Sequence, residues 1–499
     1  MVISLDKTNI ILIIMDTQRA DNLSCYGYSK KTTPNIDRIA SEGAIFLNNI
    51  IPGVWTLPSH SSLFTGRYVS GHGADANCEY LMVEFPTMAE ILRENDYHTV
   101  GFSNNGWVSR RTGVARGFEE YYMVSRNIAS KKVVEWFYVE EESFSGEEAD
   151  RGSLKTVIAA KSWLKKKWDH NRPFFMFINF IEPHGPYWPP EPFRSRFLPS
   201  DIDESELKSL PKLRSVMECV DIRVGALKLS KREWELEKAL YDGCTATVDD
   251  RIGMLYNFLK EEGLIDETVF IITSDHGDVQ GEHDPHVEHH LCVYEELVKV
   301  PLIVRYPEIV PKNVRIKWLS QTVDILPTLL DIAGIKDQRY WKTLHGYSLL
   351  PTLLENRLVR DFALIEYHTS IQQLYHMWRR HPEYDIRRLS YWIKALRTLK
   401  YKYIWYSNGR DELYDLENDP GETKNIAEEN PDILKNLKKK LEQILLSIDQ
   451  VDYGDIQRIE HRRRQFGEDS LKIFDRLRGW GFFRSIKEPK LSTEEDTTI

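Results

Sequence analysis

The segment Asn9-Ile-Ile-Leu-Ile-Ile-Met15, with Asp16 directly behind it, is the stretch that decides the fold. An apolar run without polar alternation predicts a strand that is buried on both faces. Similar runs return at Pro173–Phe180 and Thr268–Thr273, with stretches of helical periodicity between them. This pattern predicts an α/β fold, in which helices cover both faces of a large, mostly parallel sheet.

Other segments extend the same alternation of strands and helices. We expect further strands at Ala44–Ile50, Tyr97–Ser103 and Val300–Val304. We expect helices at Pro34–Glu42, Thr87–Glu94, Lys155–Lys166, Trp234–Glu262 and Ser320–Ala333.

From about Phe362 the pattern changes to short strands followed by one helix, which predicts a smaller C-terminal α+β domain. Its strands are expected at Phe362–Tyr367, Ala395–Leu399 and Lys402–Tyr406, and its helix at Asp432–Leu446. We therefore divide the chain into a large domain (1–360), a smaller domain (361–450) and a charged C-terminal extension (451–499). Insertions are expected at Met123–Leu154, Arg194–Lys231 and His368–Lys394. The last is rich in arginine and aromatic residues, which fits either a grip on an anionic or sugar substrate or a solvated or oligomer-contact helix.

The composition of the 499 residues excludes several classes of protein. With 41% hydrophobic residues the chain is not disordered, and its net charge of −10 argues against a general nucleic-acid binder. No apolar run approaches the length of a transmembrane helix. The five cysteines are odd in number and form no CxxC pair, so we expect a reducing cytoplasm rather than a disulfide framework.

Acidic residues follow two of the predicted strands, at the edge where open parallel sheets bind their ligands. Asp16 follows the first strand, and Asp275 and His276 follow Thr268–Thr273. One such aspartate is commonly a helix cap or a turn residue. Two of them, one with a neighbouring histidine, favour a ligand site.

The segment from His276 to His290 contains five of the fifteen histidines, far more than a uniform scatter would place there. Four carboxylates stand between them: Asp278, Glu282, Asp284 and Glu288. Mixed oxygen and nitrogen ligands suit a divalent metal ion such as Mg, Mn, Ca or Zn. The alternative is a polar, solvated loop.

Two further residues are candidates for the chemistry. Thr56 stands at the expected start of a helix that Gly66 closes, where it could be a simple N-cap or an activated hydroxyl. His184 follows the strand at Pro173–Phe180, and it is either a structural histidine or part of the same site.

These pieces together resemble the sulfatase family within the alkaline phosphatase superfamily. The matching stretches are Ile10–Gly27, Thr33–Gly43, Trp55–Gly66, Phe180–Tyr187, Thr273–Pro301 and Lys402–Ile426. Their number and their order along the chain make the resemblance specific.

The resemblance implies a role for each matching residue. Asp16, Asp275, His276 and Thr56 match metal ligands, and Thr56 also matches the nucleophile. His184 and His290 match residues that contact the ester group or protonate the leaving oxygen. Asn105, or its neighbour Asn104, falls near a substrate-binding Lys/His position, and His60 falls at the arginine position of the nucleophile motif.

The departures from the family pattern bear on the reaction. Typical members carry Cys or Ser in a [CS]-x-P-x-R motif, which is oxidised to formylglycine. This chain has Thr56-Leu57-Pro58-Ser59-His60, and threonine cannot become that aldehyde. Thr17 also replaces the second residue of the usual Asp-Asp pair. Threonine nucleophiles are familiar instead from phosphoryl-transferring relatives in the superfamily.

The sequence therefore predicts a metal-dependent hydrolase of phosphate mono- or diesters or phosphonates. Two alternatives stay open: a sulfatase that uses unmodified Thr56, and a transferase that moves a phospho-substituent onto a glycan or lipid head group. A non-catalytic binding relative is a further reading. The expected partner is a small anionic ester, and an oligomer is possible.

Overall fold

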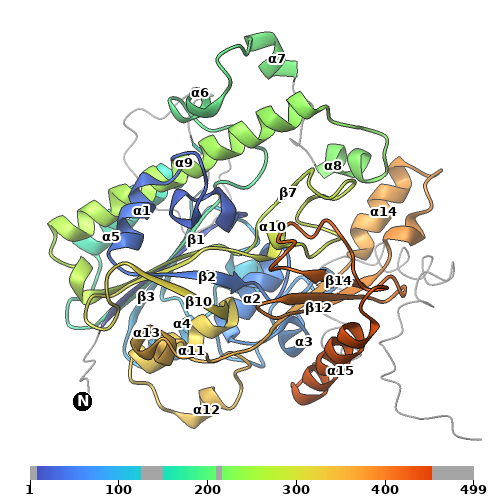
Figure 1. Cartoon of the computed structure of the whole chain (residues 1–499). Coiled ribbons are helices and arrows are strands. Elements are labelled where there is room, and N and C mark those ends of the chain that lie inside the picture. Colours follow the sequence, from blue (N-terminus) through green and yellow to red (C-terminus); the bar gives the residue numbers. More distant parts are fainter. Residues whose placement is uncertain (1–7, 125–149, 210–215, 452–499) are drawn as a thin grey trace, which may run out of the picture.

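The computed structural model describes residues 8–124, 150–209 and 216–451, in which a large central sheet adjoins a smaller one (Figure 1). The predicted charged extension beyond Val451 and most of the predicted insertion at Met123–Leu154 lie outside these residues. Among the described helices, none combines the length and the apolar character that crossing a bilayer requires.

The large sheet has eight strands in the order β10-β2-β9-β6-β1-β5-β3-β4. At its centre, β1 pairs in parallel with both β5 and β6, whereas β9 runs antiparallel to β2 and β6. The strands are β1 (Asn9–Met15), β2 (Ala44–Ile50), β3 (His98–Ser103), β4 (Glu120–Met123), β5 (Phe174–Phe180), β6 (Thr268–Thr273), β9 (Leu302–Arg305) and β10 (Val314–Gln321). The predicted, mostly parallel sheet is confirmed.

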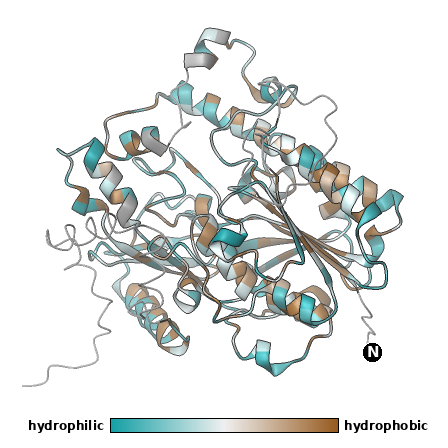
Figure 2. Cartoon of the chain, turned by 180° about the vertical axis from the view of Figure 1, so that it is seen from behind, coloured by the Kyte–Doolittle hydropathy of each residue, from teal (hydrophilic) through white to brown (hydrophobic). Residues whose placement is uncertain are grey.

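The apolar run of β1 has no polar alternation because helices cover both faces of the sheet. Ile10, Leu12 and Ile14 belong to one hydrophobic core, and the alternate residues Ile11, Ile13 and Met15 belong to the other. The first core is closed by α2 (Thr56–Thr65), α4 (Met88–Glu94) and α11 (Ile325–Ile332), and the second by α1 (Pro34–Ser41), α5 (Ser153–Lys166) and α9 (Lys231–Glu261). Figure 2 shows apolar strands at the centre, with hydrophilic residues on the covering helices.

The remaining elements of the large domain are short. They are α3 (Val69–His72), α6 (Phe193–Phe197), α7 (Glu204–Ser209), α8 (Val216–Arg223), α10 (Glu295–Val298), α12 (Gln338–Trp341), α13 (Leu350–Glu355) and the hairpin β7 (Val279–Gln280) and β8 (Val287–Glu288). Several of them, including α8, belong to the loops at the carboxyl ends of the strands, where the candidate site lies.

The smaller sheet is antiparallel, with β11 (Ala363–His368), β12 (Trp392–Arg397), β13 (Tyr401–Tyr406) and β14 (Glu412–Asp415) in sequence order. Helix α15 (Pro431–Ser447) packs on one face through Leu437, Leu441 and Ile444. The opposite face joins the core of the large domain. The insertion after β11 forms helix α14 (Ile371–Arg380). The boundary at 360/361 stays a prediction.

Three strands of the eight- and four-stranded sheets escaped the sequence analysis, for two physical reasons. In β10, buried and solvent-facing residues interchange because it is an edge strand, so no continuous apolar run marks it. Its last two residues, Ser320 and Gln321, were expected to begin a helix, but α11 starts only at Ile325. The other two, β4 and β14, are edge strands of four residues, too short for a periodicity to show.

Candidate active site

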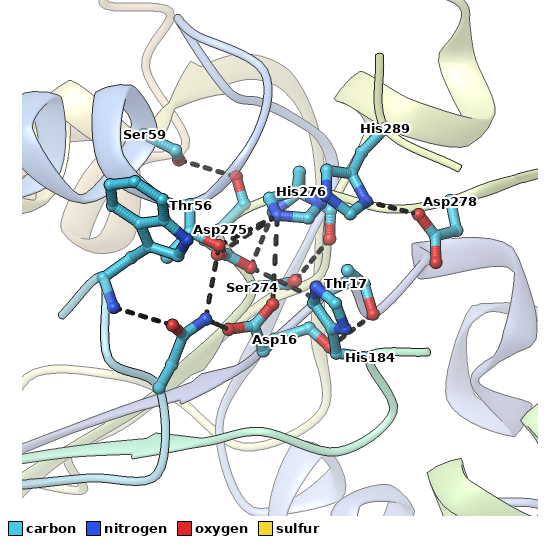
Figure 3. A network of polar contacts seen from close by, with 12 residues as sticks. Asp16, Thr17, Thr56, Ser59, His184, Ser274, Asp275, His276, Asp278 and His289 are labelled. Carbon is cyan, nitrogen blue, oxygen red and sulfur yellow. Dashed lines mark hydrogen bonds and ion pairs between the residues drawn. The ribbon is translucent and has the colours of Figure 1, made fainter. Parts of the chain in front are cut away.

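Three of the predicted metal ligands meet at the carboxyl ends of β1 and β6. The two strands are in parallel register, with Ile14 opposite Thr273, so Asp16 emerges beside Asp275 and His276. All three side chains are buried. His276 Nε2 lies 3.4 Å from Asp275 Oδ2 and 3.9 Å from Asp16 Oδ1 (Figure 3).

Two carboxylate oxygens of this cluster have no hydrogen-bond partner, although they are buried: Asp16 Oδ1 and Asp275 Oδ2. The other oxygens are satisfied, since Asn105 Nδ2 donates to Asp16 Oδ2 (2.7 Å) and the backbone N–H groups of Thr17 and His276 donate to Asp275 Oδ1. Unpartnered buried carboxylate oxygens are costly, and a cation between them would satisfy both. The residues present therefore fit a divalent metal ion.

The electrostatics of the cluster point the same way. Burial raises the pKa of Asp16 to about 6, with a further contribution from the charge of Asp275. Burial raises the pKa of Asp275 to about 7. Burial, with His289 nearby, lowers the pKa of His276 to about 3. The protein alone thus disfavours the two negative charges, which a bound cation would stabilise.

Thr56 is the first residue of the ten-residue helix α2, so its hydroxyl lies at the positive end of the helix dipole. Thr56 Oγ1 is 3.5 Å from His276 Nε2 and 3.4 Å from Asn105 Nδ2. The Ser59 hydroxyl, in the same turn, donates to the backbone oxygen of Asp275 (2.6 Å). This bond ties the start of α2 to the end of β6.

Backbone strain is concentrated around these residues. Of the eight non-glycine residues with positive φ in the described part of the chain, four adjoin site residues: Thr17 (φ 62°), Trp55 (φ 67°), Glu288 (φ 55°) and Leu291 (φ 68°). Trp55, with ψ 167°, lies in a region of backbone space that is normally reserved for glycine. Such strain of about 1–3 kcal/mol per residue persists where the surrounding structure fixes a functional geometry.

Asn105 and His60 support the cluster from different sides. Asn105 contacts both Asp16 and Thr56, so the structure brings it into the site. His60 lies one turn into α2 and is fully buried; its Nδ1 is 2.8 Å from the backbone oxygen of Thr56 and 3.6 Å from Asp275 Oδ2. His60 therefore contacts the backbone of Thr56, and its role in substrate binding stays a prediction.

Three histidines line the site beyond His276. The ring of His289 is 4.4 Å from that of His276 and 5.3 Å from that of His184. The ring of His290 is 4.6 Å from that of His289, and its Nε2 is 3.1 Å from Gln373 Nε2 in α14. His184 thus lies with the cluster, whereas His290 reaches it through His289.

His289 and Asp278 are site residues that the sequence analysis did not single out. His289 Nδ1 is 2.8 Å from Asp278 Oδ1, and the Tyr187 hydroxyl donates to Asp278 Oδ2 (2.5 Å). His276, Asp278 and His289 could together hold a metal ion. Both Asp278 oxygens already have hydrogen-bond partners, however. Asp278 is therefore better suited to orienting the His289 imidazole than to binding a metal ion. The histidine-rich segment was the available signal, but spacing alone did not distinguish His289 from His290.

The predicted insertion at His368–Lys394 lies next to the histidines of the site. Its helix α14 reaches His290 through Gln373, and Arg380 pairs with Asp221 of α8. Arg387 pairs with Asp385, which belongs to the insertion itself. A grip on the substrate through these arginines stays a prediction.

Comparison with known proteins identifies the family on both parts of the chain. Residues 8–335 match the family model described as Sulfatase. Residues 281–447 match a model described as N-sulphoglucosamine sulphohydrolase, C-terminal. The first match alone covers more than half of the chain.

Individual relatives agree with these matches. An N-acetylglucosamine-6-O-sulfatase of Bacteroides thetaiotaomicron is 26% identical over 484 residues, covering 84% of this chain and 82% of the relative. A protein solved with its substrate D-glucosamine-2-N,6-O-disulfate shares the fold with a TM-score of 0.68, at 23% identity over 88% of this chain and 97% of its own. A phosphonate monoester hydrolase of Agrobacterium radiobacter does so with a TM-score of 0.69, at 22% identity over 88% and 96%.

Proposed function

The chain belongs to the sulfatase family of ester-hydrolysing enzymes, and from this premise we propose that it cleaves phosphate mono- or diesters, or phosphonate esters, with Thr56 as its nucleophile. The observation that carries this proposal is the hydroxyl of Thr56 at the start of α2, beside two unpartnered carboxylate oxygens. Thr56 stands at the motif position where the family carries the Cys or Ser that becomes formylglycine, so the formylglycine route has no precursor there.

Asp16, Asp275, His276 and Thr56 would hold the metal ion. A divalent ion bound there polarises the ester oxygen and lowers the pKa of the neighbouring hydroxyl. Asn105 fixes the orientation of Asp16, and Ser59 fixes the start of α2 against β6. These contacts keep the nucleophile and the ligands in one arrangement before substrate arrives.

In the proposed reaction, Thr56 Oγ1 gives its proton to solvent and attacks phosphorus, forming a P–Oγ1 bond as the bond to the leaving alcohol breaks. The leaving oxygen takes a proton from His184, since burial lowers the pKa of His289 to about 3 and that of His290 well below its usual value. Water then attacks phosphorus, the P–Oγ1 bond breaks, Thr56 takes a proton from the attacking water, and the histidine recovers its proton from solvent. The free N–H groups at the start of α2 stabilise the negative charge that develops.

Sulfate esters are the second candidate substrate class. The N-acetylglucosamine-6-O-sulfatase supports it, and the phosphonate monoester hydrolase supports the first class. A sulfated Thr56 would lack the elimination route of an aldehyde hydrate, so attack by water at sulfur would have to release it. Transfer of a phospho-substituent to a glycan or lipid head group is a third candidate. We also propose a cytoplasmic location. This proposal is supported by the five cysteines, all of which are free thiols.

A substrate panel tests the proposal. The protein is assayed with an aryl phosphate, a phosphodiester, a phosphonate monoester and an aryl sulfate, each with Mg²⁺, Mn²⁺, Ca²⁺ and Zn²⁺. Preferred turnover of the phosphorus esters, lost in Thr56→Ala, is expected. Thr65→Ala, at the other end of α2, serves as the matched control. Preferred turnover of the sulfate ester, or full activity of Thr56→Ala, would contradict the proposal.

A further inference from the structure

An exposed tryptophan stands at the edge of the active site. Trp107 is 37% exposed, and its backbone N–H donates to Asn105 Oδ1 (2.9 Å). The amide nitrogen of the same Asn105 side chain reaches Asp16 Oδ2 and Thr56 Oγ1. One asparagine therefore joins the nucleophile, a metal-ligand candidate and the backbone that carries this indole.

Trp107 is held in place both at its ring and at its backbone. Its ring meets that of Trp55 edge to face, with centroids 5.3 Å apart and an interplanar angle of 85°. Its backbone oxygen accepts a hydrogen bond from the Thr112 hydroxyl (2.7 Å). Since Trp55 directly precedes Thr56 and is only 8% exposed, the buried tryptophan links the exposed one to the nucleophile.

The surroundings of Trp107 are open on the solvent side. Gly106, its neighbour, is exposed, and a Cβ built there would meet no atom within 4 Å. Single exposed apolar residues are ordinary on protein surfaces. A fixed, partly exposed indole beside a nucleophile is different, because it offers a flat apolar face that needs no reordering to bind.

We propose that Trp107 is a binding platform for the alcohol portion of the ester, and that this portion is a ring, either a pyranose or an aryl group. The inference rests on the proposed function, since it assumes that an ester binds at Thr56. The C–H face of a sugar, or an aromatic face, can stack on the indole and gain dispersion energy. An acyclic head group offers no flat face of this kind.

Steady-state kinetics of Trp107→Ala with Mn²⁺ test the platform on 4-nitrophenyl phosphate, glucosamine 6-phosphate and glycerol 3-phosphate. We expect KM to rise by about 3- to 10-fold for the two ring esters, the size of an aromatic contact. For the acyclic ester KM should change less than about twofold, and kcat should stay close to wild type for all three. Trp107→Phe should recover part of the affinity, because it keeps an aromatic face.

The control is Tyr347→Ala, which removes an exposed aromatic ring that packs on the Arg360 guanidinium, 5.1 Å from the ring centroid, rather than on the site. If Trp107→Ala lowers kcat equally for all three esters and leaves KM unchanged, the residue only braces Trp55, and the platform is wrong. Equal rises in KM for ring and acyclic esters would overturn it as well.

Calorimetric binding separates this inference from the proposed function. D-Glucosamine-2-N,6-O-disulfate and glucosamine 6-phosphate are titrated into Thr56→Ala, with and without Trp107→Ala. A Kd weakened by about 3- to 10-fold in the double variant supports the platform even if no phosphorus ester is turned over. An unchanged Kd would refute it even if the hydrolase activity is as proposed.

Discussion

Two sets of buried carboxylates in this protein differ in their partners. In the smaller sheet, Glu366 of β11 pairs with the ammonium of Lys394 and accepts two hydrogen bonds from Ser70, at 2.9 and 3.2 Å. At the carboxyl ends of β1 and β6, Asp16 and Asp275 are equally buried, and each has one oxygen without a hydrogen-bond partner. The chain itself supplies a cation for Glu366, which we call the complete set. Among the described residues it supplies none for Asp16 and Asp275, which we call the incomplete set.

The pKa values follow this difference. Burial alone would raise the pKa of Glu366, but the charge of Lys394, together with the hydrogen bonds from Lys394 and Ser70, holds the pKa below its usual value. Asp16 and Asp275 have no such cation nearby, so their pKa values rise to about 6 and 7. A buried carboxylate that the chain leaves without a cation therefore marks a place for an external one.

The largest effect is expected at the incomplete set. Asp275→Asn should lower kcat/KM by about 10³-fold or more, because it removes a proposed anionic metal ligand next to Thr56. Without metal the variant should melt no lower than wild type, since the costly buried charge is gone. Kinetics and thermal melts in EDTA check both points. The control is Asp96→Asn, which changes an exposed aspartate before β3. Near-normal activity of Asp275→Asn would contradict the prediction that the Asp16–Asp275 site needs an external cation for activity.

At the complete set the effect should fall on stability. Lys394→Ala leaves Glu366 charged and buried without its cation, which costs about 3–5 kcal/mol in free energy of unfolding. Denaturant titration measures this loss. The double variant Lys394→Met with Glu366→Met should recover much of it. If added Mn²⁺ restores the free energy of unfolding of Lys394→Ala, the Glu366 position also accepts an external cation. That result would contradict the difference drawn between the two sets.

The metal should stabilise the protein in a pH-dependent way. Between about pH 4 and 7 the metal-free folded state holds protons on Asp16 and Asp275 that the unfolded state releases, so these groups contribute less stability as the pH rises. Binding a cation requires both carboxylates ionised, so the stabilisation by Mn²⁺ should grow across this window, to about 2–3 kcal/mol at 100-fold excess over Kd.

The buried histidines have lowered pKa values, so they contribute more stability as the pH rises. Comparing the melting temperature with and without metal at the same pH cancels this contribution. Thermal melts at pH 5, 6, 7 and 8 provide the measurement, and Asp275→Asn serves as the control. A stabilisation that is constant with pH would mean that the ligands are already ionised without metal.

The smallest effect is expected from Ser70→Ala. It removes the hydroxyl bond to Glu366, while the shorter backbone bond and Lys394 remain. A loss of about 0.5–1.5 kcal/mol is expected, with kcat and KM unchanged. Denaturant titration and kinetics measure both. A larger loss would show that the ion pair depends on this hydroxyl.

The sequence predicted the sheet well because β1, β5 and β6 are buried on both faces, which leaves an unbroken apolar signature. It predicted that Asp16, Asp275 and His276 meet, because parallel strands release their following residues at one edge. It did not single out His289 or Asp278, since the fold of β7 and β8 decides which histidine turns inward. Trp107 carried no signal at all, because its importance comes from Asn105 and Trp55, which only the tertiary structure brings to it.

The placement of β1 has a consequence for how the chain is made. Its neighbours in the sheet are β5 and β6, and β6 begins only at Thr268. At a synthesis rate of about 5–20 residues per second, the first strand waits roughly 10–50 s for its second partner. During that time an apolar strand with free edges is open to wrong pairing. Production in cells should therefore gain from a low expression level, which makes encounters between such chains rarer, and from chaperones that shield β1.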